Sequence, residues 1–325
     1  MLINWINWHD SNKRHYSNFK YENVYFKLSN KVILNIFILL ASLLQNKGLI
    51  DASAAIKKNG KIEFNQIYFN FGLKPTLKNS CKVFCKIKGH ENMKIELEYD
   101  QIQKFTQRKE FEYVICDGKH SITIQSEDGS KMLNGFLYVY QEFDQIVIVD
   151  VDGTLTISNK RGHLLIFISY YLNTNICINY WSHKNVVELL RKYKEMGYKI
   201  VYLSSRPQIL NKYPRYLLEN LEPNGNHLPD GQLIVSEKNF FCATLQELTN
   251  SQNYKANKLK SLKNLGLEIG VAFGNTMKDK IAYKEAKIDN IFIINKSSVL
   301  SKENKNGSII FQDGYKDLLD SITSN

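Results

Sequence analysis

Residues 145–154 read Gln-Ile-Val-Ile-Val-Asp-Val-Asp-Gly-Thr, and this stretch decides the expected fold. Its four consecutive apolar residues, 146–149, are typical of a strand buried on both faces of a parallel sheet. The run ends at Asp150, and Asp152 follows two positions later, just before the turn former Gly153. Ligands of open parallel sheets bind outside the carboxyl ends of the strands, so two acids in this place predict a functional site.

The sequence after this strand alternates between apolar strand patterns and amphipathic helix patterns. Such alternation predicts a doubly wound α/β domain, with helices on both faces of a mostly parallel sheet, and we place it at residues 141–325. The expected elements are a helix at 185–196, a strand at 199–203, further helix, a strand at 268–273, a helix at 279–286 and a strand at 290–294.

The sequence before this strand is different in kind. Short, closely spaced segments of alternating apolar and polar residues, separated by turn signals, fill residues 47–140. Many short strands in close succession predict a β-sandwich. The expected strands are Ile50–Ile56, Ile62–Phe71, Cys81–Ile87, Met93–Tyr99, Phe111–Cys116, Ser121–Gln125 and Gly135–Tyr140. Residues 1–30 show no sustained period and stay unassigned.

Composition and charge narrow the class of partner. Of 325 residues, 43% are hydrophobic and 23% are charged, which is ordinary for a folded globular protein. The net charge of +11 favours an anionic partner. Basic residues are scattered and no nucleic-acid-binding motif occurs, so we expect a negatively charged membrane surface and no nucleic acid.

The apolar stretch 32–44 could make that membrane contact. It is shorter than the roughly 20 residues that span a bilayer, so no transmembrane segment is expected. Its apolar residues recur at helical spacing, which predicts a helix within residues 31–46. From the pattern alone, this helix either touches a membrane or packs in a core.

Polar residues follow three of the expected strands. They are Asp150–Thr154, Ser204–Arg206 and Gly274–Asp279, and the topology brings them to one edge of the sheet. Burying so many polar groups without a ligand or metal would be costly. Two of the groups also have a simpler structural interpretation: a calcium-binding or surface turn for the first, and a helix N-cap for Ser204. An EF-hand is disfavoured because its terminal Glu is absent and a buried strand precedes the turn.

Together, the three groups predict phosphoryl transfer. Asp150 can present an ionised oxygen to phosphorus, and Asp152 can hand a proton to the leaving oxygen and later take one from water. Thr154 belongs to the same catalytic loop, and Ser204 would hydrogen-bond the transferring group. Lys255 is the candidate for a catalytic cation, although its Lys-rich helix would ordinarily form a solvated face.

A carboxylate that approaches a phosphate dianion needs a hard cation to offset the repulsion, and Mg²⁺ is the expected cofactor. The candidate metal ligands are Asp150, Asp152, Asn275 and Asp279. The candidate substrate-binding residues are Gly153, Ser205 and Arg206.

These motifs are similar to those of the haloacid dehalogenase-type phosphatases, and the wider sequence resembles the lipins. The catalytic resemblance spans roughly residues 135–320 and is carried by Asp150–Thr156, Gly162-His163, Trp181–His183, Tyr202–Arg206, Leu228–Gly231 with Ser236, Tyr254-Lys255 and Ala272–Asn275 with Asp279. An upstream resemblance to the lipin amino-terminal block is carried by Gly48–Asp51, Asn59-Gly60, Phe69–Gly72 and Lys86–Gly89.

The resemblance implies Mg²⁺-dependent hydrolysis of phosphatidate to diacylglycerol and phosphate. It implies a haloacid dehalogenase-like domain fused to an immunoglobulin-like sandwich, and a membrane-contacting helix ahead of the amino-terminal block, where residues 32–44 lie. It further implies a cytoplasmic protein at the periphery of endoplasmic reticulum and nuclear membranes, with the nucleus as another location. Two alternatives stay open: a phosphatase of soluble esters or phosphoproteins, and a non-catalytic phosphatidate-binding module.

The sequence departs from the lipin pattern in three places. The long polar linker between the two blocks is missing, and residues 1–30 have no counterpart. Between His163 and Trp181 the chain is longer than expected and carries an apolar run, 164–172. This run is either an extra lid near the site or a sequence artefact such as a retained intron.

Overall fold

The computed structural model describes residues 50–58, 62–64, 82–88, 90–99, 105–107, 116–126, 129, 132–157, 179, 182–208, 211–222, 225–236, 240–304 and 307–324. All of them belong to one compact unit, Gln45–Asn325. The expected helix at 31–46, the apolar run 164–172 and residues 1–30 lie outside the described residues.

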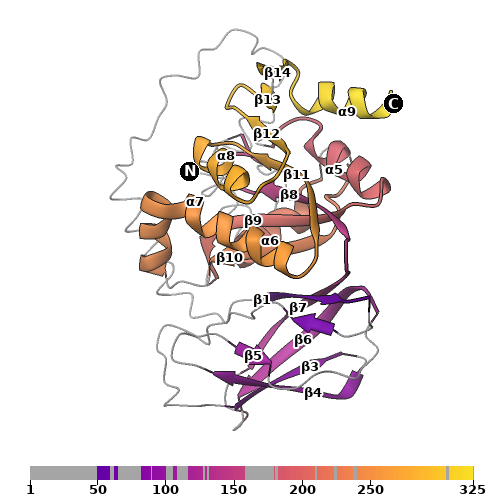
Figure 1. Ribbon diagram of the computed structural model, residues 1–325, viewed down its shortest axis with the longest axis vertical. Helices are drawn as coiled ribbons and strands as arrows, with labels where there is room; N and C mark the ends of the chain where they lie inside the picture. The colour runs from indigo at the N-terminus through magenta and orange to yellow at the C-terminus, as the bar shows by residue number, and fades with distance from the viewer. Residues whose placement is uncertain are drawn as a thin grey trace, which may run out of the picture. The chain divides into compact units, whose positions relative to one another are not determined.

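The carboxyl-terminal part is built on a seven-stranded sheet with the order β10-β9-β8-β11-β12-β13-β14 (Figure 1). The first five of these strands are parallel, and β13 and β14 are antiparallel. In chain order the elements are β8 (Gln145–Asp150), α5 (Val186–Glu195), β9 (Lys199–Pro207), α6 (Lys212–Asn220), β10 (Gly231–Ser236), α7 (Phe240–Asn264), β11 (Glu268–Gly274), α8 (Met277–Glu285), β12 (Asn290–Ile294), β13 (Leu300–Asn304), β14 (Gly307–Phe311) and α9 (Tyr315–Thr323).

Strand β8 is central in this sheet, as its apolar run predicted. Residues 146–149 are each at most 1% exposed. Ile146 and Ile148 pack into a cluster with Tyr254, Leu259 and other side chains of α7 and α8, while Val147 and Val149 point to the opposite face because successive strand residues alternate. Burying such a side chain contributes about 1.5–3 kcal/mol, so this strand anchors both layers.

Chain order reverses at β8. The crossover through α5 leads from β8 to β9, whereas the crossover through α8 leads from β11 to β12 in the other direction. Right-handed crossovers therefore put α5 and α8 on opposite faces, and α7 and α8 lie side by side on one of them (Figure 1). The carboxyl end of β8 is thus the switch point at which open α/β sheets bind ligands.

The doubly wound α/β prediction is confirmed, with three differences in detail. Strand β10 was expected as helix, because its short run Gln232–Val235 is too brief to show a period of its own. Strand β9 continues through Pro207 instead of ending at residue 203, so Ser204–Arg206 lie within a strand. The β13–β14 hairpin was not expected, since β13 has one apolar residue and the apolar residues of β14 are consecutive instead of alternating.

The amino-terminal strands form a second seven-stranded sheet with the order β2-β1-β7-β6-β3-β4-β5. Its strands are β1 (Ile50–Ile56), β2 (Ile62–Phe64), β3 (Lys82–Ile87), β4 (His90–Tyr99), β5 (Phe105–Gln107), β6 (Gly118–Ser126) and β7 (Met132–Gln141). Strands β1 and β2 pair antiparallel, and β1 also pairs in parallel with β7. The described strands make one sheet, so the immunoglobulin-like sandwich stays a prediction, as does the domain boundary after residue 140. Most of the expected strand 111–116 lies outside the described residues.

Candidate active site

Asp150 is the last residue of β8, and its side chain is held from within its own loop. The carboxyl group is buried, with the residue 4% exposed, and Oδ2 accepts a hydrogen bond from Thr154 Oγ1 at 3.0 Å. Gly153 turns the loop with a φ of 84°, a conformation that favours glycine. The loop is closed further by Gly153 N, which donates to Thr156 Oγ1 at 3.2 Å.

Lys255 joins two of the three strand ends. Its Nζ lies 2.5 Å from Asp150 Oδ1 and 2.5 Å from Asp279 Oδ1. The residue is 5% exposed, so it does not belong to a solvated helix face as the Lys-rich segment around it suggested. Two carboxylates from distant parts of the sequence therefore contact the same ammonium group.

Asp279 is fixed by the first turn of α8. Its Oδ2 accepts from Thr276 Oγ1 at 2.6 Å, from Thr276 N at 2.9 Å and from Asn275 N at 3.2 Å, while Thr276 Oγ1 caps the helix through Asp279 N. This capping box leaves Oδ1 for Lys255. A Cβ at Gly274 would lie 2.6 Å from Asp279 Cβ, so the close approach requires glycine there.

Asp152 faces a different set of partners. The Arg206 guanidinium makes a bidentate contact with its carboxylate, in which Nε donates to Oδ2 at 3.0 Å and Nη2 donates to Oδ1. Ser204 Oγ donates to the same Oδ2 at 3.4 Å. Ser204 is inside β9 and fully buried, so it is not the helix N-cap that its sequence context allowed. The structure gives Arg206 a carboxylate partner, where a substrate-binding role was expected.

Two side chains contact backbone carbonyl groups of the loop after β8, and the sequence analysis assigned neither of them a role. His183 is 1% exposed and lies with Nε2 3.3 Å from the Gly153 carbonyl and Nδ1 2.9 Å from Ser298 Oγ. Tyr315, at the start of α9, donates its hydroxyl to the Thr154 carbonyl at 3.0 Å. The T-x-x-D capping signal at Thr276 was readable from the sequence, whereas a lone tyrosine 161 residues from its partner was not.

Burial and mutual repulsion shift the acids of this site. Burial raises the pKa of Asp150 to about 7, and the negative charges of Asp279 and Asp152 add to the rise, against the opposing effect of Lys255. Burial would also raise the pKa of Asp279, but Lys255 and the hydrogen bonds from Thr276 and Asn275 outweigh it and lower that pKa. One ammonium group thus faces two buried carboxylates, and the cluster is short of positive charge.

The family model LNS2 (Lipin/Ned1/Smp2) matches residues 99–324, which includes every residue of this site. The chain belongs to the lipin family. Nuclear elongation and deformation protein 1 of Schizosaccharomyces pombe is 31% identical, over 55% of this chain and 27% of its own length. Human phosphatidate phosphatase LPIN1 is 28% identical, over 58% of this chain and 21% of its own, and phosphatidic acid phosphohydrolase 1 of Saccharomyces cerevisiae is 28% identical, over 55% and 22%. The lipin chain described here thus matches about a fifth to a quarter of the length of these relatives.

The lipin site has the donors that a magnesium ion prefers. Mg²⁺ is usually held by one or two carboxylates together with substrate phosphate and water, so a dedicated cage of side chains is unnecessary. Within the described ranges, no three His, Cys, Asp or Glu side chains converge on one point, but Asp150 and Asp279 converge on Lys255 Nζ. The excess negative charge of this cluster fits a divalent cation. The carboxylate of Asp152 has Arg206 and Ser204 as its partners, on another side of the loop.

The structure therefore brings the sequence-predicted residues together in two groups. In the first group Lys255 contacts Asp150 and Asp279, and in the second Arg206 contacts Asp152. The first group is Asp150, Thr154, Lys255, Asn275 and Asp279, and the second is Asp152, Ser204 and Arg206. Gly153 supplies the turn between them, and Ser205 follows Ser204 in β9 as a half-buried residue.

Proposed function

We propose that this lipin-family chain is a Mg²⁺-dependent phosphatidate phosphatase that works through an aspartyl-phosphate at Asp150. One observation carries the proposal: a buried carboxylate at the switch point of the sheet shares Lys255 with Asp279, while a second carboxylate two residues on is held separately. Phosphatidate is proposed as substrate because several relatives, human LPIN1 among them, are named as phosphatidate phosphatases.

In the first half of the reaction, an oxygen of Asp150 attacks phosphorus, and the bond between phosphorus and the glycerol oxygen breaks. Asp152 gives its proton to that leaving oxygen, and diacylglycerol departs. In the second half, Asp152 takes a proton from water, which attacks the aspartyl-phosphate and releases phosphate. A bound Mg²⁺, held by Asp150 and Asp279 with Asn275 nearby, would supply the positive charge that lets two anions approach.

The remaining residues position these two acids. Lys255 and Thr154 orient the oxygens of Asp150, and fixed charges of this kind are usually the largest catalytic contribution. Arg206 and Ser204 hold Asp152 in the present geometry, which gives the proposed acid–base group a fixed orientation. Gly153, Ser205 and the loop amides would then contact the phosphate.

We also propose peripheral contact with anionic membranes, through residues 32–44 among others, on the cytoplasmic side of endoplasmic reticulum and nuclear membranes. The net charge of +11 supports contact with an anionic surface. None of the described helices is long and apolar enough to cross a membrane.

The deciding experiment measures phosphate release by the purified chain from vesicle-borne phosphatidate and from soluble phosphate esters, each with and without Mg²⁺. We expect Mg²⁺-dependent release that is faster from the lipid. The Asp152→Asn variant should lose turnover and keep vesicle binding. Faster turnover of soluble esters would point to the soluble phosphatase, and vesicle binding without phosphate release would point to the non-catalytic module.

A further inference from the structure

The outward face of α8 carries a stripe that mixes apolar and basic side chains. Met277, Lys280, Ile281 and Lys284 follow the i, i+3, i+4, i+7 spacing of one helix face. Met277 is 64% exposed and Ile281 is 38% exposed, so two large apolar side chains on this helix face water. The inward face of the same helix is buried and carries Asp279 into the active site.

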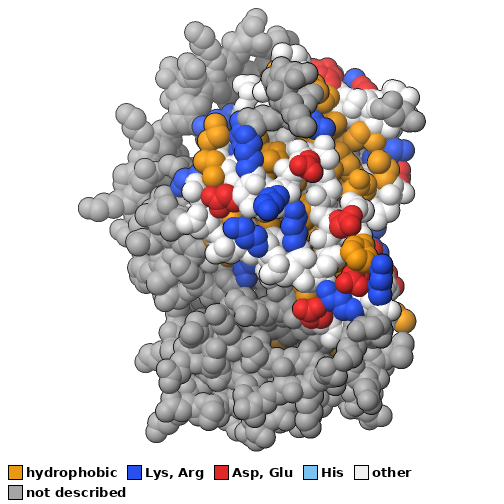
Figure 2. All heavy atoms as spheres, in the orientation of Figure 1, with side chains coloured by type: hydrophobic (Ala, Val, Ile, Leu, Met, Phe, Trp, Pro, Cys, Tyr) orange, Lys and Arg blue, Asp and Glu red, His pale blue; other side chains and the backbone are white. Residues whose placement is uncertain are grey.

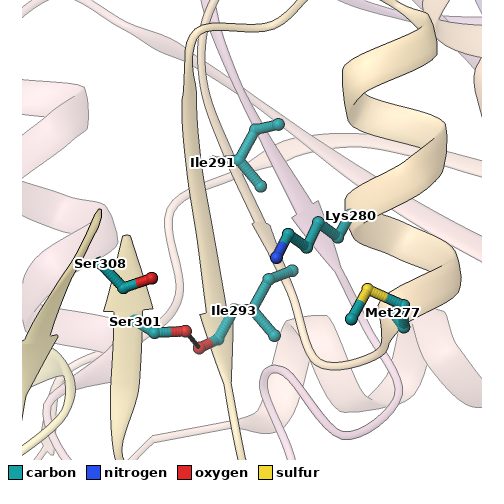
Figure 3. A pocket seen from close by; sticks show the side chains of 6 residues that line it. All are labelled: Met277, Lys280, Ile291, Ile293, Ser301 and Ser308. Carbon is teal, nitrogen blue, oxygen red and sulfur yellow. Dashed lines mark hydrogen bonds between the residues drawn. The ribbon is translucent and has the colours of Figure 1, made fainter. Parts of the chain in front are cut away.

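Beside this stripe the surface is hollowed. The hollow has a volume of about 170 Å³, and Figure 3 shows side chains from three sources converging on it. They are Met277 and Lys280 from α8, Ile291 and Ile293 from β12, and Ser301 and Ser308 from the β13–β14 hairpin. Its walls are thus apolar side chains with one ammonium group and two hydroxyls.

The pairing of neighbouring strands shows that the apolar surface continues beyond the hollow and reaches the active site. Ile293 pairs with Gly274 on one side and with Ser301 on the other, and Ser301 pairs with Ile310. These four residues form one row across β11–β14, and side chains in such a row share a face of the sheet. Gly274 precedes the loop that places Asp279, so the row runs from the active site to Ile310, which is 48% exposed.

We propose that this surface, made of the hollow, Met277, Ile281 and Ile310, contacts the lipid around the substrate headgroup in an anionic bilayer. The inference deepens the proposed function and rests on it for the identity of the lipid. Lys280 and Lys284 provide charge that complements anionic headgroups, and long lysine stems can lie along apolar surface while their heads stay in water. Figure 2 shows Lys and Arg side chains gathered over the α7–α8 face, with apolar side chains beside them.

A bilayer suits this surface because of where the chemistry takes place. The phosphate of a membrane lipid must reach Asp150 while the acyl chains stay in apolar surroundings. The apolar surface meets that requirement because it shares a row of paired strand residues with Gly274, next to the active site. The basic residues of the α8 stripe complement the negative charge of a bilayer that contains the substrate.

The test compares two neighbouring residues of β14. Ile310 and Ile309 have similar exposed fractions, 48% and 45%, but successive strand residues point to opposite faces, so Ile309 is a matched control. Ile310→Ser should lower activity on phosphatidate in phosphatidylcholine vesicles by about fivefold, as expected when half of such a side chain no longer leaves water. The same variant should leave activity on soluble dibutanoyl phosphatidate unchanged, and Ile309→Ser should change neither.

Equal vesicle activity of the two variants would overturn the proposal, and so would a loss by Ile310→Ser on both substrates. Ile281→Ser, on α8, should repeat the vesicle-specific loss, and thermal melting of all three variants checks that they fold. If the wild-type chain hydrolyses no phosphatidate, the proposed function fails, yet cosedimentation of Ile310→Ser and Ile309→Ser with the same vesicles still decides whether this surface binds lipid.

Discussion

Lys255 Nζ lies 2.5 Å from Asp150 Oδ1, and it makes the same contact with Asp279 Oδ1, so two buried carboxylates share one ammonium group. This relationship explains how the end of β8 and the first turn of α8 can place two buried acids at the same point. Under the proposed function Lys255 also has two tasks, since it would position the nucleophile Asp150 and would stabilise the fold around it.

Replacing Lys255 by Met separates these tasks. We expect phosphatase activity to fall by about 100-fold or more, because a fixed charge at the reacting oxygen is lost. Two unpaired buried carboxylates should also lower the melting temperature, and Mg²⁺ should raise it more in this variant than in the wild type. Melting curves with and without Mg²⁺ provide the measurement.

Lys260→Met is the control, since Lys260 is an exposed residue of the same helix. It should leave both activity and melting close to wild type. A Lys255→Met variant whose melting responded to Mg²⁺ no more than the wild type would contradict a cation site at Asp150 and Asp279.

Arg206→Lys tests whether the bidentate contact of Arg206 orients Asp152. The guanidinium donates through two nitrogens, and the single ammonium of lysine cannot reproduce that geometry. We expect kcat to fall at least about tenfold, because the acid–base group loses its orientation, while Mg²⁺ dependence is unchanged. Steady-state kinetics of Arg206→Lys beside Arg191→Lys, an exposed arginine of α5, would show the effect. Matching kcat values in the two variants would remove Arg206 from the positioning role.

The sequence predicted the part of the site that is coded by strand ends. The apolar run 146–149 located β8, and the acids after it located the loop, because a buried parallel strand has a recognisable composition. Lys255 could be named as a candidate, but its burial could not, since a Lys-rich helix has the same pattern whether or not one lysine turns inward. The contact of Tyr315 with Thr154 was not predictable for another reason: it joins segments 161 residues apart and leaves no local signal.

The same reasoning explains the elements that were missed. Gly231–Ser236 is short, and its three apolar residues in a row do not distinguish a strand from a buried helix turn. The β13–β14 hairpin lies toward the sheet edge, where β13 is mostly polar and the apolar residues of β14 do not alternate, so neither strand shows a period of two. Elements and residues with a local sequence pattern could be predicted, whereas those that depend on tertiary contacts could not.

His183 makes the stability of the chain depend on pH. Burial lowers its pKa to about 4, although the Gly153 carbonyl acts in the opposite direction, whereas an unfolded histidine titrates near 6.5. Between these values the unfolded chain binds the additional proton, so the free energy of unfolding rises with pH across this window and the contribution is complete above it. The expected difference is about 3 kcal/mol between pH 4 and pH 6.5.

Urea unfolding of the wild type and of His183→Gln at several pH values isolates this contribution, because all other groups are common to both. Glutamine can still donate to the Gly153 carbonyl but carries no titrating proton. The stability advantage of the wild type should therefore shrink as the pH falls from 6.5 to 4. A constant difference across that window would show that His183 is not the buried neutral group described above.

Asp51 and Arg215 connect the amino-terminal strands to the catalytic sheet. Their side chains are 0% and 5% exposed and are 2.5 Å apart between Oδ2 and Nη2, and Asp51 Oδ2 also accepts from Leu233 N in β10 at 2.7 Å. Removing one partner leaves the other charge buried without compensation, so Asp51→Leu and Arg215→Met should each lower the free energy of unfolding by about 3–5 kcal/mol.

The double variant Asp51→Leu with Arg215→Met distinguishes charge pairing from simple packing. Apolar residues of similar volume can replace a buried ion pair with little loss, so the double variant should be more stable than either single one. Chemical denaturation of the three variants measures this coupling, with Arg191→Met as the exposed control. Additive losses would mean that the two side chains contribute independently. In that case the amino-terminal strands would have to be held against the catalytic sheet by the apolar contacts of Ala55, Tyr138 and Tyr140 with the cluster around Ile146, and not by the ion pair.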